Sequence, residues 1–244
     1  MKTQSFRIFN PRPSARLQLV CFPHAGGGAS TFHQWAIDLP DFVELVALQL
    51  PGREVRLRDA PVSSYLQLRD PLLDDLKEVL RTPYLTFGHS FGAALSYALI
   101  RDAGSRIALP GHMILSAASP PVATFRSHRT ISDEELENRL RELGGTPPEI
   151  LANPGFLKMI LPALRADLEI LRGGDLAGLC PLPIAFSTFA GSDDRAVAPH
   201  EVTKWAALSS VGTAHHIFEG GHFFLHQNRD EVISEVVRVT ETVS

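Results

Sequence analysis

The feature that most constrains this chain is the pentapeptide GHSFG at residues 88–92. A short apolar segment, Tyr84–Phe87, precedes it, and a helical pattern, Phe91–Asp102, follows it. A G-x-S-x-G sequence between a strand and a helix is typical of a nucleophile elbow, in which the serine lies at the apex of a sharp, strained turn. The alternative is that the two glycines only flank a structural serine. The strand before and the helix after favour Ser90 as a nucleophile.

Short apolar segments alternate with longer amphipathic ones along most of the chain. The short segments are bounded by Gly or Pro and predict strands over Leu17–Phe22, Glu44–Leu50, Tyr84–Phe87, His112–Ala117, Ile184–Phe189 and His215–Phe218. The amphipathic segments predict helices over Ser63–Leu80 (interrupted or kinked at Pro71), Phe91–Asp102, Pro199–Leu208 and Glu231–Thr240. Several strands are apolar on both faces, as in a parallel sheet covered by helices. With the elbow, this pattern predicts an α/β fold, specifically an α/β-hydrolase with a mostly parallel sheet flanked by helices.

The stretch from residue 120 to residue 175 breaks the alternation. Helical patterns cover Ser132–Leu143 and Gly155–Leu171, and Ser132 has capping-box spacing to Glu135. Ligands of open α/β sheets bind at the carboxyl edge of the strands. We therefore expect residues 120–175 to form a helical lid inserted over that edge. An ordinary crossover with a long loop is the alternative, although such loops are rare inside compact domains.

A glycine-rich loop, residues 22–30, follows the first predicted core strand. Hydrolases of this fold take one oxyanion-hole amide from a loop of this kind and another from the residue after the nucleophile. The candidate donors are therefore the backbone amides of Ala25 and Phe91. A phosphate-binding loop is the competing interpretation, but the sequence lacks the Lys-Ser/Thr pair of a P-loop and the dinucleotide-binding glycine spacing. His24 precedes the elbow in sequence, so we expect it to shape this loop or line the pocket.

The catalytic acid and base are expected after Ser90, because the triad of this fold runs in the order Ser, acid, His. The predicted strand Ile184–Phe189 leads into a loop that carries both Asp193 and Asp194. The Gly-x-x-Asp-x-x-Val spacing favours Asp194 as the acid, with Asp193 as the alternative. Two glycines precede His222 and free the backbone to turn its imidazole toward the serine, which favours His222 as the base.

The other histidines and the cysteines give no pattern for a metal site. His226 is the rival base, and we expect it on the following helix. His215 and His216 are neighbours in a strand and point to opposite faces, so they cannot chelate one metal well. No Cys/His cluster has zinc spacing, so no cofactor or metal is expected. Cys21 and Cys180 both lie in apolar sequence, which predicts two buried free thiols rather than a disulfide.

Length and composition predict one domain over residues 1–244, of which 44% are hydrophobic. The formal net charge is −4, and no basic cluster indicates nucleic-acid binding. Residues 1–16 lack the apolar core of a secretory signal, and no apolar run reaches the roughly 18 residues of a transmembrane helix. We therefore expect a cytoplasmic protein without membrane attachment. Nothing in the sequence demands more than a monomer.

Several short motifs occur along the chain in the order of a known family. They are FPHAGG at 22–27, PGRE at 51–54, GHSFG at 88–92, LRAD at 164–167, GxxD at 191–194 and GGHF at 220–223. Together they resemble the type II thioesterases that accompany polyketide synthases and nonribosomal peptide synthetases. The resemblance implies a stand-alone editing hydrolase that removes stalled or incorrect acyl groups from the phosphopantetheine arm of acyl or peptidyl carrier proteins. It also implies a mobile lid. Members usually carry Met after the nucleophile, and Phe91 stands there in this chain.

Three residues of these motifs have no chemistry that follows from the sequence. Arg53 could contact a phosphate or form a structural ion pair, and both possibilities stay open. Arg165 and Asp167 match their motif without a derivable role.

Other functions fit the same residues. A chain-releasing acyl-carrier-protein thioesterase would use the same triad on a finished product, and a general carboxylesterase would cleave oxygen esters. An inactive hydrolase-fold scaffold is the alternative outside enzymes. Such scaffolds commonly lose a triad member, whereas Ser90, an acid and His222 are all present here.

Overall fold

The computed structural model describes residues 4–81, 83–121 and 131–243. Within these residues, one seven-stranded sheet has the order β1-β3-β2-β4-β5-β6-β7. Its strands are β1 (Phe6–Arg7), β2 (Leu17–Phe22), β3 (Val43–Leu48), β4 (Tyr84–His89), β5 (His112–Ser116), β6 (Ala185–Gly191) and β7 (Thr213–Phe218). β1 pairs with β3 in antiparallel fashion, and the pairings among β2 to β7 are parallel. The predicted mostly parallel sheet is confirmed. β1 was not predicted, because two residues carry no periodicity.

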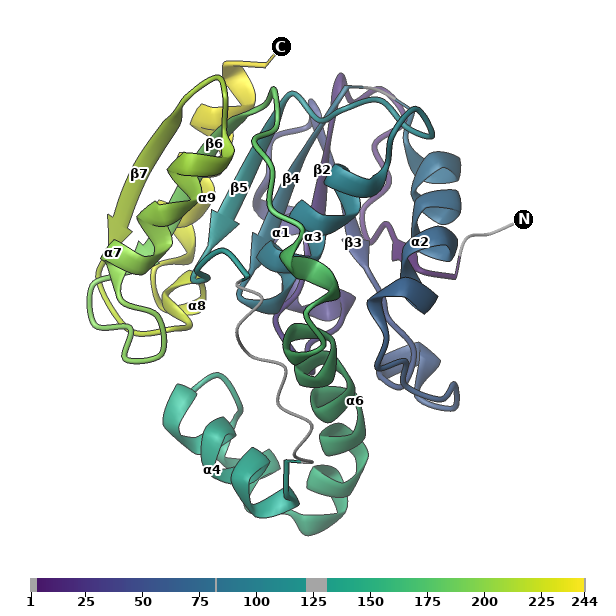
Figure 1. Ribbon diagram of the computed structural model, residues 1–244, viewed down its shortest axis with the longest axis vertical. Coiled ribbons are helices and arrows are strands. Elements are labelled where there is room, and N and C mark those ends of the chain that lie inside the picture. Colours follow the sequence, from purple (N-terminus) through teal and green to yellow (C-terminus); the bar gives the residue numbers. More distant parts are fainter. Residues whose placement is uncertain (1–3, 82, 122–130, 244) are drawn as a thin grey trace.

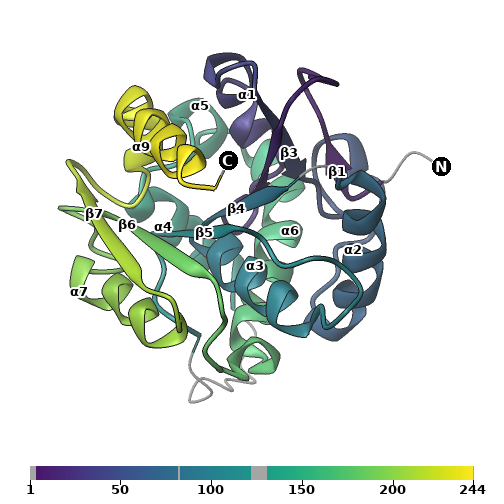
Figure 2. The same cartoon turned by 90° about the horizontal axis from the view of Figure 1, so that it is seen from above.

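Helices cover both faces of this sheet (Figures 1 and 2). In the view from above, α1 and α9 lie on one face, and α2, α3 and α7 lie on the other. The α-helices of the described residues are α1 (Trp35–Asp38), α2 (Tyr65–Val79), α3 (Phe91–Asp102), α4 (Asp133–Leu143), α5 (Pro148–Leu151), α6 (Pro154–Arg172), α7 (Pro199–Val202), α8 (Phe224–Gln227) and α9 (Arg229–Glu241). Short 3₁₀ turns are η1 (Ala29–Phe32), η2 (Glu54–Arg56), η3 (Asp175–Ala177) and η4 (Thr203–Leu208).

Each face of the sheet has its own apolar core. Successive residues of a strand point to opposite faces, so Val20 and Phe22 of β2 pack under α2 and α3, while Leu19 and Cys21 pack under α1 and α9. The central strands are buried along their whole length, because helices cover both of their faces. The carboxyl ends of β4, β6 and β7 are thereby held in a rigid frame.

Helix α2 continues through Pro71, so of the two predicted effects of this proline, an interruption or a kink, the interruption is wrong. A proline removes one helical hydrogen bond, to the carbonyl four residues earlier. Pro71 lies on the exposed side of α2, whereas Leu68 and Leu72 beside it are buried in the core. Packing of the apolar face therefore holds the helix together across the missing bond.

The two cysteines have different surroundings, so one of the two predicted buried thiols is wrong. Cys21 is buried in β2, and burial raises the pKa of its thiol well above the ordinary value. Cys180 is exposed together with Leu179 and Pro181 on either side of it, although Leu182 two residues further on is buried in the core. Both are free thiols.

Helices α4, α5 and α6 lie beyond the carboxyl ends of the strands (Figure 1). The predicted capping box is confirmed, since Ser132 accepts from the Glu135 amide and the Glu135 carboxylate accepts from the Ser132 amide. The helices share a small apolar cluster formed by Ile131, Leu136, Leu157, Leu161, Leu164 and Leu168. Residues 122–130 of the predicted lid lie outside the described residues.

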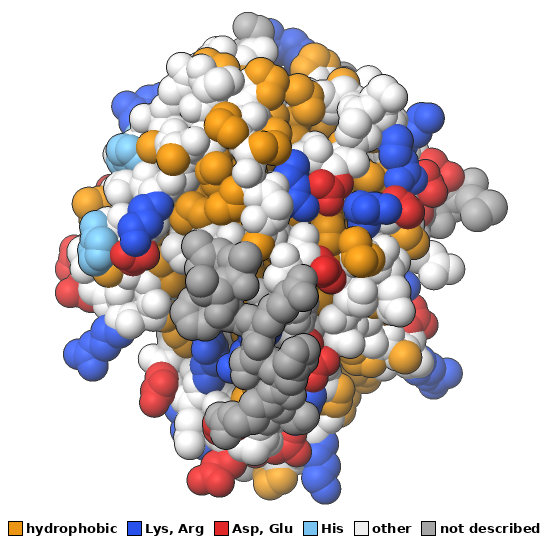
Figure 3. Space-filling model, in the orientation of Figure 1, with side chains coloured by type: hydrophobic (Ala, Val, Ile, Leu, Met, Phe, Trp, Pro, Cys, Tyr) orange, Lys and Arg blue, Asp and Glu red, His pale blue; other side chains and the backbone are white. Residues whose placement is uncertain are grey.

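The surface seen in Figure 3 carries Lys and Arg side chains interspersed with Asp and Glu, including around the lower part of the molecule. Among the helices of the described residues, none combines the length and apolar character needed to span a membrane.

Candidate active site

Ser90 lies between β4 and α3, with φ 56° and ψ −118°. A Cβ on Gly88 would collide with the backbone of Ala93, and one on Gly92 would collide with the carbonyl of Phe22. Glycine at these two positions therefore permits the close crossing of strand and helix that the turn requires. The Ser90 amide donates to the carbonyl of Ser116 at 2.7 Å, which ties the turn to β5. The predicted strand–elbow–helix arrangement is the one observed.

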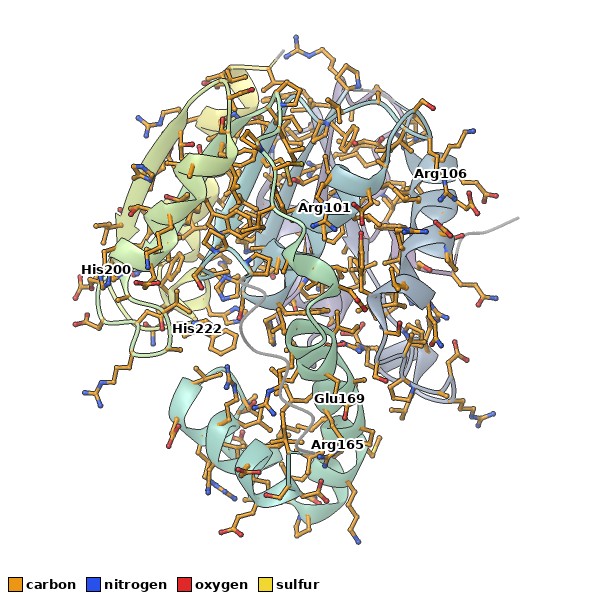
Figure 4. The ribbon with its side chains drawn as sticks, in the orientation of Figure 1. Arg101, Arg106, Arg165, Glu169, His200 and His222 are labelled. Carbon is orange, nitrogen blue, oxygen red and sulfur yellow. The ribbon has the colours of Figure 1, made fainter. Side chains whose placement is uncertain are left out.

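The structure brings Ser90, His222 and Asp194 together in one hydrogen-bonded chain. His222 Nε2 lies 3.0 Å from Ser90 Oγ, and His222 Nδ1 lies 2.7 Å from Asp194 Oδ2. Asp194 and His222 are each only 6% exposed, while Ser90 is half-buried. Figure 4 shows His222 between the end of the sheet and α4. In this geometry the carboxylate orients the imidazole, and the imidazole can take the proton of the hydroxyl as the hydroxyl oxygen attacks an electrophilic carbon.

The Asp194 carboxylate is held in its charged form. Burial opposes the charge, but the hydrogen bond to His222 and the amides of Ala196 and Val197 lower the pKa of Asp194 below its ordinary value. Those amides donate to Oδ1 at 2.8 and 3.0 Å, which leaves Oδ2 for His222. Asp193, the alternative acid, is exposed and accepts instead from the Ser192 hydroxyl at 2.7 Å. The geometry therefore selects Asp194 as the partner of His222.

One candidate oxyanion donor directly follows the serine in the chain, and the other lines the same cavity. Phe91 is the first residue of α3, so its amide has no acceptor within the helix. Ala25 lines the same cavity as Ser90 and His222. Within the part of the chain that the structure describes, neither amide donates to a protein carbonyl or side chain. Both amides are therefore without a protein acceptor among the described residues.

A cluster of neutral histidines surrounds the serine, which the sequence did not reveal. Burial, reinforced by the charges of His226, His222 and Arg53, lowers the pKa of His24 to about 3. Burial likewise lowers the pKa of His89 well below its ordinary value, and its Nδ1 lies 2.9 Å from Ser116 Oγ. His24 contacts His89 and Phe223 edge-on. At neutral pH both rings are therefore uncharged; His24 lines the cavity, whereas His89 is fully buried.

The rival base, His226, does not reach the serine. It lies on α8, as expected, and stacks on Phe223 at 5.8 Å between ring centres. Burial lowers the pKa of His226. The sequence predicted that His24 either shapes the glycine-rich loop or lines the pocket, and it does line the pocket.

The serine opens into a cavity of about 50 Å³ that α4 and α6 cover. Apolar side chains dominate its wall, which is formed by His24, Ala25, Ser90, Arg139, Leu140, Leu143, Gly145, Thr146, Leu164, Leu168, Leu171, His222 and Phe223. The contribution of Arg139, Leu140 and Leu143 could not be read from the sequence, because it depends on where α4 lies over the sheet. A small apolar chamber beside a nucleophile suits the acyl part of an ester or thioester.

The motif residues left without a role form ion pairs. Arg53 pairs with Asp167 of α6 in the interior. Of the two possibilities for Arg53, a phosphate contact or a structural ion pair, the structure shows the ion pair. Arg165 pairs with Asp133 and donates to the carbonyl of Ile131 at the base of α4. Among the described residues, no group of three or more His, Cys, Asp or Glu side chains could hold a metal ion.

Comparison with known proteins identifies the family of this chain. The model of the thioesterase domain family matches residues 17–239, so the chain belongs to the thioesterase family. It is 29% identical to the gramicidin S biosynthesis protein GrsT of Aneurinibacillus migulanus, over 92% of this chain and 89% of that protein. It is 33% identical to the medium-chain S-acyl fatty acid synthase thioesterase of Homo sapiens, over 92% and 88%.

Solved structures give the same result. The type II thioesterase BorB of the borrelidin biosynthetic cluster superposes with a TM-score of 0.84 and 32% identity, over 96% of both chains. RedJ, a thioesterase of the prodiginine pathway in Streptomyces coelicolor, has a TM-score of 0.85 and 32% identity, over 93% of this chain and 92% of that one. The predicted α/β-hydrolase fold and the predicted thioesterase class of enzyme are confirmed.

Proposed function

We propose that Ser90, His222 and Asp194 are the nucleophile, general base and orienting acid of a thioester hydrolase. The observation that carries this proposal is the continuous Ser90–His222–Asp194 hydrogen-bonded chain at an apolar cavity. The amides of Ala25 and Phe91 are the proposed oxyanion donors. We further propose that residues 1–244 form one domain, with residues 120–175 as its lid.

The reaction follows from these parts. His222 Nε2 takes the hydroxyl proton as Ser90 Oγ attacks the acyl carbonyl carbon, and the two amides stabilise the oxyanion by about 3 kcal/mol each. The C–S bond then breaks, and the leaving sulfur receives the proton held by His222. His222 next deprotonates a water that attacks the acyl-serine, which releases the carboxylic acid and returns the proton to Ser90.

We propose that the substrate is an acyl group on the phosphopantetheine arm of an acyl or peptidyl carrier protein, removed to edit stalled or aberrant intermediates. The proposal is supported by relatives named for gramicidin S, borrelidin and prodiginine biosynthesis. The phosphopantetheine belongs to the substrate, so the enzyme itself needs no cofactor in this scheme. The small cavity beside Ser90 favours short acyl groups.

A second candidate is chain release of a finished medium-length acyl product. The human relative, which is named a medium-chain fatty acid synthase thioesterase, favours it. The cavity of about 50 Å³ counts against it, since a medium chain requires α4 to move away from its position over Ser90. The two candidates share a triad and differ in the acyl length they accept.

The test is to incubate the protein with acyl-phosphopantetheinyl carrier protein and follow loss of the acyl mass by intact mass spectrometry. The loads are acetyl, propionyl, medium-chain and aminoacyl groups, with Ser90→Ala and acyl-CoA as controls. Deacylation of several short loads, abolished in Ser90→Ala, supports editing. Cleavage of the medium-chain load alone supports chain release. Hydrolysis of simple oxygen esters without any carrier-protein deacylation would overturn both.

A further inference from the structure

Asp167 is a fully buried carboxylate at a point where α6 meets the loop of residues 24–28. Its Oδ2 accepts from the Gly26 amide at 2.8 Å and from Arg53 Nη1 at 2.5 Å, and its Oδ1 accepts from Arg53 Nη2 at 2.9 Å. Arg53 is itself only 6% exposed. A buried carboxylate without partners is very costly, so these bonds are needed to keep Asp167 in place.

The bonds from this pair act on the peptide groups directly after Ala25. Gly26 has φ 76°, and the Gly27 amide donates to the His24 carbonyl at 3.0 Å, so residues 24–27 form a turn with a left-handed third residue. Asp167 fixes the Gly26 amide of that turn, and Arg53 Nη1 donates to the Gly27 carbonyl at 3.1 Å. If the central peptide flipped, the Ala25 carbonyl would face the Asp167 carboxylate, which electrostatic repulsion disfavours.

Packing reinforces the link between α6 and the loop. A Cβ built on Gly26 would lie 3.3 Å from Cβ and 3.5 Å from Cα of Leu164, so the turn and the helix pack too closely for a larger residue at this position. Leu164 also lines the cavity beside Ser90. Arg53 Nε donates to the Pro51 carbonyl at 3.3 Å, so most of the N–H groups of the guanidinium bond to acceptors of the protein itself.

We propose that Asp167 and Arg53 are positioning residues that hold the 24–27 turn, and with it the Ala25 amide, in the orientation that oxyanion stabilisation needs. The proposal rests on the function proposed above. Helix α6 is then both a wall of the acyl cavity and a fixed support of the oxyanion hole. Loss of the support affects the transition state more than substrate binding, because negative charge develops on the carbonyl oxygen only as Ser90 attacks.

The experiment measures kcat and KM for the acetyl thioester of N-acetylcysteamine, alongside thermal unfolding. Asp167→Asn replaces one carboxylate oxygen by a donor that faces the Arg53 guanidinium. We expect kcat to fall about 10- to 100-fold, with KM within about threefold of the wild type. Binding of a trifluoromethyl ketone, which forms an oxyanion on Ser90, weakens by the same factor as kcat.

Two further variants separate positioning from folding. The double variant Arg53→Met/Asp167→Leu removes both charges, so it leaves no unpaired ion and tests the site in a folded protein. We expect its melting temperature to recover relative to Asp167→Asn while kcat stays at least about 10-fold low, because nothing accepts from the Gly26 amide. Asp133→Asn, which breaks the exposed pair with Arg165 elsewhere on α6 (Figure 4), is the matched control and keeps wild-type kcat.

The outcomes are distinguishable. A double variant that recovers kcat together with its melting temperature would overturn the positioning role and leave a purely structural pair. So would a folded Asp167→Asn variant with unchanged kcat. If the Ser90→Ala variant hydrolyses the thioester as fast as the wild type does, the proposed function fails, and the positioning role fails with it.

Discussion

Ser90 has a backbone conformation that residues with a side chain rarely adopt, because Cβ at positive φ approaches the neighbouring peptide. The strain is held by the surrounding frame, since β4 ends and α3 begins at fixed places in the core and the Ser90 amide is bonded to β5. The same geometry puts Oγ within hydrogen-bond reach of His222. Local strain and reactivity therefore have one structural origin.

Replacing Ser90 by glycine should relieve this strain. We expect Ser90→Gly to unfold at a higher denaturant concentration than Ser90→Ala, by about 1 kcal/mol of unfolding free energy, because both lack the hydroxyl and only glycine tolerates the dihedral angles. Both variants should be inactive. Equal stability of the two in urea titrations would show that the turn carries no strain.

The adjacent aspartates of the β6–α7 loop provide an internal comparison. Asp194→Asn is expected to lower kcat by about 10⁴-fold, because the amide cannot hold His222 in the same tautomer and stabilise its charged form. Asp193→Asn, one residue away and exposed, should stay within about twofold of the wild type. The check is steady-state hydrolysis of a short acyl thioester, and similar losses in the two variants would contradict the assignment of Asp194.

At the scale of elements, the helices beyond the sheet are unequal. α6 buries eight residues, among them Asp167, and is tied to the body of the protein by the Arg53 pair. α4 buries only Leu136 and contributes the Leu140 and Leu143 side of the cavity wall. Movement that admits a substrate is therefore expected in α4 and α5, with α6 as the fixed part.

Hydrogen–deuterium exchange tests this division. Amides of α4 and α5 should exchange at least about 10-fold faster than those in the middle of α6, because exchange follows local opening and few buried contacts oppose it in α4. Peptides covering residues 133–151 and 157–170 give the comparison. Equal protection of the two segments would indicate that the helices open as one unit.

At the scale of the whole molecule, several histidines are buried in neutral form. Burial lowers the pKa of His112 to about 4, and its Nε2 lies 2.9 Å from Ser187 Oγ. Burial lowers the pKa of His24 to about 3 and that of His89 well below its usual value. Each of these groups binds a proton more readily in the unfolded chain than in the folded protein.

Stability is therefore expected to fall as the pH drops from about 6.5 toward 4, by up to about 1.4 kcal/mol per pH unit for each such histidine. Stability falls with pH because these histidines take up a proton near their ordinary pKa in the unfolded chain but not in the folded protein. A lower pH therefore stabilises the unfolded chain. His112 is the residue to change because it lies away from Ser90. His112→Gln should reduce the slope of the unfolding free energy against pH by up to the equivalent of one proton. Guanidinium unfolding at pH 7, 6 and 5 measures it, and an unchanged slope would contradict the role of His112.

Much of this protein was determined by local sequence. The alternation of apolar and amphipathic segments specified the parallel sheet, because strand and helix periodicities are properties of neighbouring residues. The glycines around Ser90 specified the elbow, and the chain order of Ser90, Asp194 and His222 specified the triad whose geometry the structure displays. The capping box at Ser132 was equally local, since both partners lie within one turn.

The rest was decided by tertiary structure. The spacing after β6 favoured Asp194 but left Asp193 as the alternative, and only the packing of that loop places Asp194 against His222. α2 continues through Pro71 because Leu68 and Leu72 beside it are buried, and Cys180 is exposed because the chain comes to the surface between the buried Leu176 and Leu182. The Arg53–Asp167 pair joins residues 114 positions apart, so only the folded chain can show that a motif arginine supports the turn that carries Ala25. Interactions between residues distant in sequence depend on packing, and packing is set by the whole fold.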